Sequence, residues 1–159
     1  MDAKVIWKGN LSFDGQNESG STLQLDGDSN VSGGDGGFRP MQLLAIGLAG
    51  CTAMDVISIM TKKRQNVTAF EVQVHADRAE THPKVFTEAT VEYIFTGVGI
   101  DEIALQRSIE LSVSTYCPAQ AMLSQVMPIS SKYKIYEDHG NGQRSLVKEA
   151  EFRLPELAN

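Results

Sequence analysis

The sequence predicts an α+β fold, in which runs of antiparallel strand surround two main helices. Apolar and polar residues alternate through residues 70–77 and again through residues 85–95, which is the period of half-buried strands. Residues 40–60 form a long apolar stretch, and residues 101–116 repeat apolar side chains at helical spacing. These two strands and two helices are the main elements that the prediction rests on.

The first part of the chain predicts three short strands, at residues 5–7, 11–13 and 21–25. Residues 26–37 are rich in Gly, Asp and Ser and predict a loop. Pro40 then takes the favoured first-turn position of the long helix. Residues 62–64 (Lys-Lys-Arg) end this helix, where their charge complements the negative end of its dipole. Because the helix is apolar on most faces, we expect it to be a central element of the core.

The same apolar stretch raises the question of a membrane span. Residues 43–60 just reach the length that a span requires. Asp55 lies well inside this segment, and a charge there costs about 2.5–3.5 kcal/mol on insertion. Two glycines and two hydroxyl residues weaken the apolar pattern further. We therefore expect a buried helix of a soluble protein, with no membrane partner.

The remaining elements follow from the same patterns. Residues 81–84 predict the turn between the two long strands, and Asp101 is placed to cap the second helix. Pro118 opens a short helix, and residues 131–137 alternate as a last strand.

Length and composition favour one soluble domain. The chain has 159 residues, of which 42% are hydrophobic and 21% are charged. These values are ordinary for a globular protein that is long enough to bury a core. Residues 139–159 are polar and lack a strong core pattern. We therefore assign one domain to residues 1–138 and a loose C-terminal extension to residues 139–159.

Charge and cysteine content narrow the classes of function. The net charge of −6 argues against a nucleic-acid partner, because phosphate binding favours a basic surface. No apolar targeting run follows Met1 and the chain has only two cysteines, so we expect a reducing, cytoplasmic setting. The three histidines do not fall at metal-ligand spacing with each other or with the cysteines, and we expect no metal site.

The two cysteines are the candidate functional residues, and their local settings differ. Cys51 lies in the middle of the long helix, with Asp55 one turn further on the same face. A carboxylate in an apolar helix should be hydrogen-bonded or paired. Cys117 precedes Pro118 and is therefore the expected N-cap of the short helix. Free backbone N–H groups and the helix dipole would lower the pKa of a thiol there. From the residues alone, the pair is consistent with inert core thiols, a disulfide or a peroxide-reducing pair.

Four stretches of the sequence resemble the OsmC/Ohr family, the osmotically induced and organic-hydroperoxide-resistance proteins. They are residues 37–44 (Gly-Phe-Arg-Pro-Met-Gln-Leu-Leu), 47–56 (Gly-Leu-Ala-Gly-Cys-Thr-Ala-Met-Asp-Val), 79–86 (Ala-Glu-Thr-His-Pro-Lys-Val-Phe) and 116–118 (Tyr-Cys-Pro). The similarity spans roughly residues 4–137. The Cys-Thr-Ala-Met-Asp-Val version of the second stretch is similar to the OsmC-like branch of the family.

The resemblance implies an intertwined homodimer, with two long central helices packed between antiparallel sheets and each of two active sites at the subunit interface. It implies thiol-dependent reduction of hydroperoxides, with organic ones preferred. Cys51 matches the family's peroxide-attacking cysteine and Cys117 its resolving cysteine. A cellular dithiol would then reduce the oxidised pair by thiol–disulfide exchange, and no metal or organic cofactor is needed.

The sequence departs from the family's pattern around the attacking cysteine. The family carries a glutamate directly after the proline, where this chain has Met41 followed by Gln42. The family's arginine comes from the N-terminal strands, but this chain has no arginine before Arg39. Lys8 could replace its charge but not its bidentate fork. Arg39, Gln42, Asp55 and Lys8 are therefore the candidates to support the two cysteines.

Two alternatives to a peroxidase follow from this departure. One is a non-catalytic binder of a small apolar ligand or acyl group, whose cysteines are vestigial or sense oxidation. The other is a structural domain with two buried thiols. The missing acid and arginine favour the binder, and retention of both cysteines favours the peroxidase.

Overall fold

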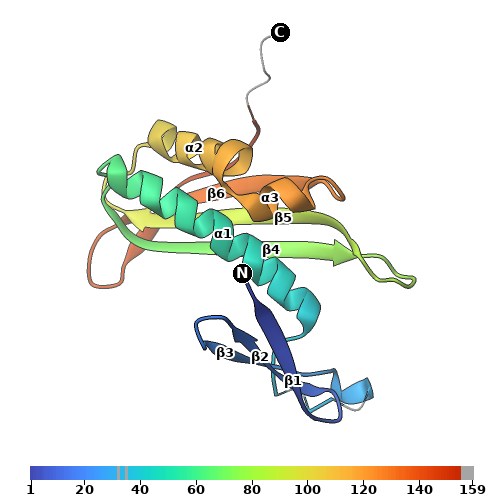
Figure 1. Ribbon diagram of the computed structural model, residues 1–159. Coiled ribbons are helices and arrows are strands. Elements are labelled where there is room, and N and C mark those ends of the chain that lie inside the picture. Colours follow the sequence, from blue (N-terminus) through green and yellow to red (C-terminus); the bar gives the residue numbers. More distant parts are fainter. Residues whose placement is uncertain (32, 35, 155–159) are drawn as a thin grey trace. The chain divides into compact units, whose positions relative to one another are not determined.

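The structure is a computed structural model that describes residues 1–31, 33–34 and 36–154 of the chain. It has the expected α+β class, with helices and two separate sheets (Figure 1). The chain divides into two compact units, Met1–Leu44 and Ala45–Asn159, and helix α1 (Pro40–Lys62) contributes residues to both.

The N-terminal unit contains an antiparallel sheet with the order β1-β2-β3. Its strands are β1 (Ala3–Gly9), β2 (Ser12–Asn17) and β3 (Thr22–Leu25), which confirms the three predicted strands. A short 3₁₀ helix, η1 (Ser29–Val31), lies within the predicted loop. The buried carboxylate of Asp26 accepts hydrogen bonds from three backbone N–H groups, those of Gly27, Gly34 and Gly36. This acid therefore orders the glycine-rich loop.

The larger unit contains a four-stranded sheet with the order β4-β5-β6-β7. Its strands are β4 (Val67–Arg78), β5 (Phe86–Gly97), β6 (Ile129–Asp138) and β7 (Arg144–Phe152). Strands β5 and β6 are parallel, whereas the other neighbours are antiparallel. The chain between β5 and β6 forms α2 (Glu102–Leu111), a π-helical turn η2 (Ser112–Tyr116) and α3 (Pro118–Leu123).

The core of the larger unit lies between this sheet and the helices, which gather on one side of it (Figure 1). Strands β5 and β6 supply alternate side chains of one face, and α1 and α2 pack against them. The fully buried members are Leu48, Val56, Met60, Val91, Tyr93, Phe95, Leu105, Ile109 and Tyr133. This packing holds α1 beside the connection between α2 and α3.

Helix α1 is buried less completely than we expected. Only a stripe at four-residue spacing is buried, consisting of Leu48, Thr52, Val56 and Met60. Met54 on another face is 73% exposed. The expected place of α1 in the core is confirmed for this stripe. Leu44, Ile46 and Met54 stay exposed in the single chain, because one sheet covers only one face of a helix. By length and composition α1 also suffices to cross a membrane, a property that the core helices of soluble proteins share.

The prediction of a loose extension for residues 139–159 is wrong for residues 144–152. These residues form β7, which pairs with β6 across a turn containing Gly140, Asn141 and Gly142 at positive φ. Ala150 and Phe152 pack against the core. The predicted domain boundary at residue 138 thus falls within a β-hairpin. The alternation of apolar and polar residues was weak because β7 is an edge strand whose first half is exposed. Residues 155–159 of the predicted extension lie outside the described part of the chain.

Candidate active site

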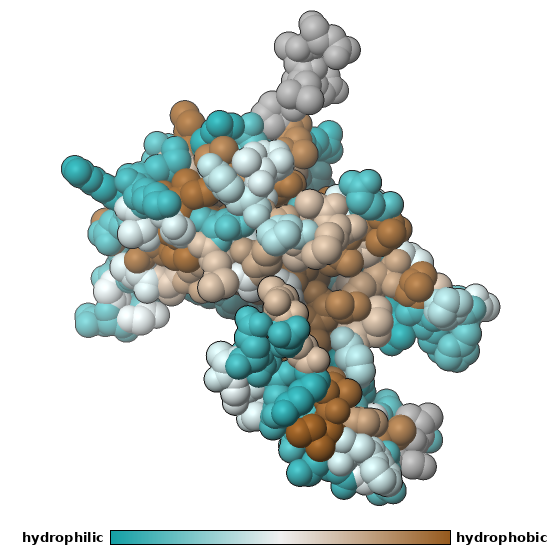
Figure 2. Space-filling view, viewed as in Figure 1, coloured by the Kyte–Doolittle hydropathy of each residue, from teal (hydrophilic) through white to brown (hydrophobic). Residues whose placement is uncertain are grey.

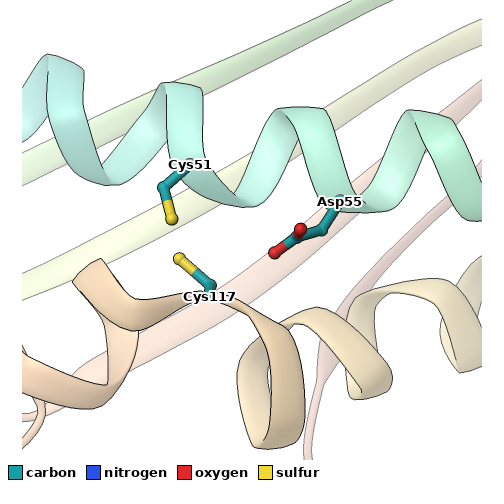
Figure 3. A group of neighbouring side chains, drawn as sticks. All are labelled: Cys51, Asp55 and Cys117. Atoms are coloured by element: carbon teal, nitrogen blue, oxygen red, sulfur yellow. The ribbon is translucent and has the colours of Figure 1, made fainter.

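The fold brings the two cysteines together, although they lie 66 positions apart in the sequence. Cys51 projects from α1 and Cys117 from the start of α3, so that their sulfurs face each other (Figure 3). The two sulfurs and one carboxylate oxygen of Asp55 all lie within 4.8 Å of one another. Both thiols are free. The structure therefore brings the two predicted cysteines together, with Asp55, one of the predicted supporting residues, beside them.

Local backbone geometry explains the position of Cys117. The π-helical turn ends α2, and the backbone N–H of Cys117 donates to the carbonyl of Ser112. Cys117 then adopts an extended conformation, and Pro118 fixes the first turn of α3. The backbone N–H of Gln120 donates to Cys117 Sγ at 3.3 Å. The predicted N-cap role of Cys117 is confirmed.

The pKa that we expected from this cap is wrong in direction. Burial raises the pKa of Cys117 to about 12, and the neighbouring Cys51 thiol adds to the rise. The N–H groups of Gln120 and Ala119 act in the opposite direction, but their effect is smaller. Cys117 is only 2% exposed, so its thiolate would lose nearly all of its hydration. Cys117 is therefore a protonated thiol at neutral pH.

Accessibility differs between the two thiols. Cys51 is partly exposed on α1, whereas Cys117 is buried beneath it. A reagent from solution therefore meets Cys51 first. This order matches the roles that the family resemblance implies, with Cys51 attacking and Cys117 resolving.

A chain of buried hydrogen bonds ends on Asp55. Ser112 Oγ donates to Asp55 Oδ2 at 3.1 Å. Ser112 Oγ also lies 2.9 Å from Thr52 Oγ1, which lies 2.7 Å from the Tyr93 hydroxyl. Because a hydroxyl has one proton to donate, Thr52 must donate to Ser112, and Tyr93 must donate to Thr52. The expectation that Asp55 is hydrogen-bonded is confirmed.

Sequence reasoning missed the three hydroxyl residues of this chain. Thr52, Ser112 and Tyr93 are each at most 1% exposed. Burial raises the pKa of Tyr93 to about 12, so its hydroxyl stays protonated and remains a donor. The one available signal was that Thr52 falls on the buried stripe of α1, where an unpaired hydroxyl would be costly.

The other predicted supporting residues lie in the N-terminal unit, each with contacts there. Lys8 Nζ pairs with Asp14 Oδ2 at 3.2 Å. Gln42 Oε1 accepts a hydrogen bond from the Arg39 backbone N–H at 2.9 Å, at the start of α1. Arg39 Nη2 lies 3.6 Å from Asp28 Oδ2. The functional roles of Lys8, Arg39 and Gln42 therefore stay predictions.

In the described part of the chain, Cys51, Asp55 and Cys117 form a group whose ligand atoms lie close enough together to hold a metal ion. Two sulfurs and one carboxylate oxygen suit zinc by ligand type, and a structural zinc site normally has four ligands. Redox assays of this site therefore need a chelator. The prediction that the protein uses no metal or other cofactor stays a prediction.

Comparison with known proteins identifies the family. The family described as OsmC-like protein matches residues 33–132. The chain belongs to the OsmC-like family. Protein YhfA of Escherichia coli K12 is 35% identical over 135 residues, which cover 85% of this chain and 98% of YhfA. The predicted membership of the OsmC/Ohr family is thereby confirmed.

Solved structures of other proteins share the fold. A hypothetical protein from Aquifex aeolicus superposes with a TM-score of 0.75 at 24% identity, covering 87% of this chain and 97% of that one. An organic hydroperoxide resistance protein OsmC from Legionella pneumophila gives a TM-score of 0.61 at 16% identity, covering 84% and 94%. At these identities the likeness establishes the fold, and the predicted OsmC-like architecture is confirmed.

Proposed function

We propose that this protein is a thiol-dependent hydroperoxide reductase in which Cys51 attacks the peroxide and Cys117 resolves the product. The observation that carries the proposal is the approach of two free thiols, one partly exposed and one buried, within 4.8 Å. Membership of the OsmC-like family supports it. So do structural neighbours described as organic hydroperoxide resistance proteins.

The chemistry balances with a peroxide and a dithiol as the two co-substrates. The Cys51 thiolate attacks one peroxide oxygen, and the O–O bond breaks. Cys51 becomes a sulfenic acid, and the leaving alkoxide takes a proton to form the alcohol. Cys117 then attacks the Cys51 sulfur, which releases water and forms a disulfide. A cellular dithiol reduces this disulfide by exchange and is itself oxidised.

We further propose that the protein acts as a homodimer. Apolar side chains gather along α1 and on the N-terminal strands (Figure 2). Trp7 is 66% exposed and Met54 73% exposed, and a second copy that covers them would bury this surface. Sedimentation at micromolar concentration should find a dimer, and a stable folded monomer would contradict this part of the proposal.

The test of the proposed activity uses stopped-flow oxidation by cumene hydroperoxide and by hydrogen peroxide, with EDTA present. Wild-type protein should turn over in the presence of a dithiol and should prefer the organic peroxide. Cys51→Ser should be inactive. Cys117→Ser should react once and then accumulate a sulfenic acid that dimedone traps. Equal rates for wild type and Cys51→Ser would refute the assignment.

A second candidate is a binder of a small apolar ligand or acyl group. The observation that favours it is an apolar groove of about 420 Å³ on the N-terminal unit, with Val5, Leu23, Leu25 and Leu43 in its lining. Calorimetric titration with a medium-chain fatty acid tests this function. Binding that Leu23→Asp abolishes, in a protein that does not consume peroxide, would favour the binder over the reductase.

A further inference from the structure

We propose that Asp55 is the proton acceptor for disulfide closure, and that the buried chain of Tyr93, Thr52 and Ser112 holds its carboxylate in position. Thr52 and Ser112 are thus positioning residues that act through Asp55. The role in peroxide turnover rests on the proposed function. The proton transfer itself applies to any reaction in which Cys117 attacks an activated sulfur on Cys51.

Closure requires a base because Cys117 must lose its proton to become a nucleophile. Cys117 is 2% exposed, and burial raises the pKa of its thiol, so the protonated form prevails at neutral pH. The thiolate is the attacking species in thiol–disulfide chemistry. The side chain is buried, so bulk water has little access to its proton. A base within the site is therefore the direct route.

Asp55 is the group with the geometry for this role. One of its carboxylate oxygens lies within 4.8 Å of both sulfurs, a span that one bridging water molecule closes. The titratable groups beside the two sulfurs include Asp55 on α1 and Tyr93 on β5, and the charges of Cys117 and Asp55 both act on Tyr93. Tyr93 is protonated and donates its hydrogen to Thr52, so it cannot accept a proton from Cys117. Asp55 is left as the acceptor.

The hydroxyl chain gives the carboxylate a fixed orientation. Ser112 Oγ donates to Oδ2, and Thr52 and Tyr93 in turn fix the Ser112 hydroxyl. These hydroxyls come from α1, β5 and the turn after α2. The packing of these elements against one another therefore fixes the hydrogen-bond chain. Figure 3 shows the carboxylate directed toward the space beside the two sulfurs. Asp55 therefore does not need to reorganise when the proton moves.

The proposed step balances in atoms and charge. The Cys117 S–H proton passes to Asp55 as the Cys117 sulfur attacks the sulfenic sulfur of Cys51. The new S–S bond forms and the S–O bond of the sulfenic acid breaks. The departing hydroxide takes the proton from Asp55 and leaves as water. Asp55 is unchanged at the end, first as a base and then as an acid.

The test follows closure without using a peroxide. The neutral reagent 4,4′-dithiodipyridine reacts with Cys51, releases one thiopyridone and leaves a mixed disulfide. Attack by Cys117 then expels the second thiopyridone, which absorbs light, and its proton passes to the base. Asp55→Asn should slow this second release by about 10²-fold, the lower end of general-base effects. The first release should keep its rate or become faster, because a negative charge beside Cys51 is removed.

The pH profile separates proton transfer from a merely structural effect. Closure in Asp55→Asn should rise more steeply with pH than closure in the wild type, because without the carboxylate it waits for Cys117 to ionise in solution. Thr52→Val should slow closure and Thr52→Ser should restore it. Glu149→Gln on β7 is the matched control, since it makes the same chemical change at an exposed position that pairs with Lys134.

The possible results of these assays either support or contradict the proposed role of Asp55. Closure in Asp55→Asn at the wild-type rate, with the wild-type pH profile, would overturn it. If Asp55→Asn does not fold, Ser112→Ala replaces it, and unchanged closure in that variant overturns the inference equally. If the wild type forms no sulfenic acid with any hydroperoxide but Asp55→Asn still slows closure, the proposed peroxidase function fails and the role of Asp55 stands.

Discussion

Replacing Thr52 by valine should destabilise the protein by breaking the buried hydrogen-bond chain at its centre. Thr52 is 1% exposed, and its hydroxyl bonds both Tyr93 at 2.7 Å and Ser112 at 2.9 Å. Valine has nearly the same shape, so the substitution leaves packing almost unchanged and removes two hydrogen bonds. Each such bond contributes about 0.5–1.5 kcal/mol net. The Tyr93 hydroxyl keeps Ser131 as a second partner, so it is not fully stranded. We therefore expect a loss of about 1–3 kcal/mol.

Urea unfolding followed by circular dichroism measures this loss, at one fixed protein concentration because a dimer's stability depends on concentration. Thr52→Ser is the matched control, since it keeps the hydroxyl and loses one methyl group, at a cost of about 1 kcal/mol. The second test is a double-mutant cycle with Tyr93→Phe. In that background Thr52→Val removes only the bond to Ser112, so its cost should fall by about half.

Two results would refute the reasoning. Thr52→Val could unfold within about 0.5 kcal/mol of the wild type, the scatter of ordinary surface changes. Alternatively, the effects of Thr52→Val and Tyr93→Phe could add fully. Either result would mean that the 2.7 Å contact between these hydroxyls does not contribute to stability.

Three further predictions follow from the packing and the pKa shifts. Burial raises the pKa of Cys117 to about 12 in the folded state, so stability should fall above about pH 8.5, where unfolded cysteine ionises, by at most about 1.4 kcal/mol per pH unit. Cys117→Ala should reduce this slope in urea titrations between about pH 8.5 and pH 10, below the pH at which unfolded tyrosine also ionises. Native peroxidase activity should be weak. Met41→Glu alone should not raise this activity, whereas Met41→Glu combined with Lys8→Arg should raise it. A native rate constant of about 10⁶ M⁻¹s⁻¹ for an organic hydroperoxide would contradict this prediction. Phe152→Ala should cost about 2–4 kcal/mol in thermal or urea unfolding, because β7 packs on the core; a loose extension would show no loss.

Much of the fold could be predicted from local patterns. The alternation that indicated β4 and β5 reflects a sheet with one covered face, and Pro40 and Asp101 marked the two helix starts. The edge strand β7 was not predicted, because an edge strand with an exposed first half alternates only weakly. The Gly140–Gly142 turn was its one clear signal, since residues of this kind favour tight hairpins.

The site was predictable as a pair of residues but not as an environment. The family resemblance paired Cys51 with Cys117, and the proline identified the N-cap. The direction of the Cys117 pKa depended on burial by α1 and the sheet, which no local pattern reports. The hydroxyl chain joins residues 41 and 60 positions apart, so only the tertiary structure could reveal it.

The burial of Cys117 explains how two adjacent thiols can have different tasks. In the proposed reaction a protonated, buried thiol would not compete with Cys51 for peroxide, so oxidation would begin at the partly exposed thiol. Once Cys51 carries a leaving group, the same burial would prevent closure unless a base removes the Cys117 proton. The hydrogen bond from the Gln120 N–H lowers the pKa of Cys117 by less than burial raises it, so the resting thiol stays protonated. The same N–H is in place to stabilise the negative charge that develops on Sγ during attack. In the proposed reaction, burial would therefore set the order of the two steps, and Asp55 together with the N-cap would make the second step possible.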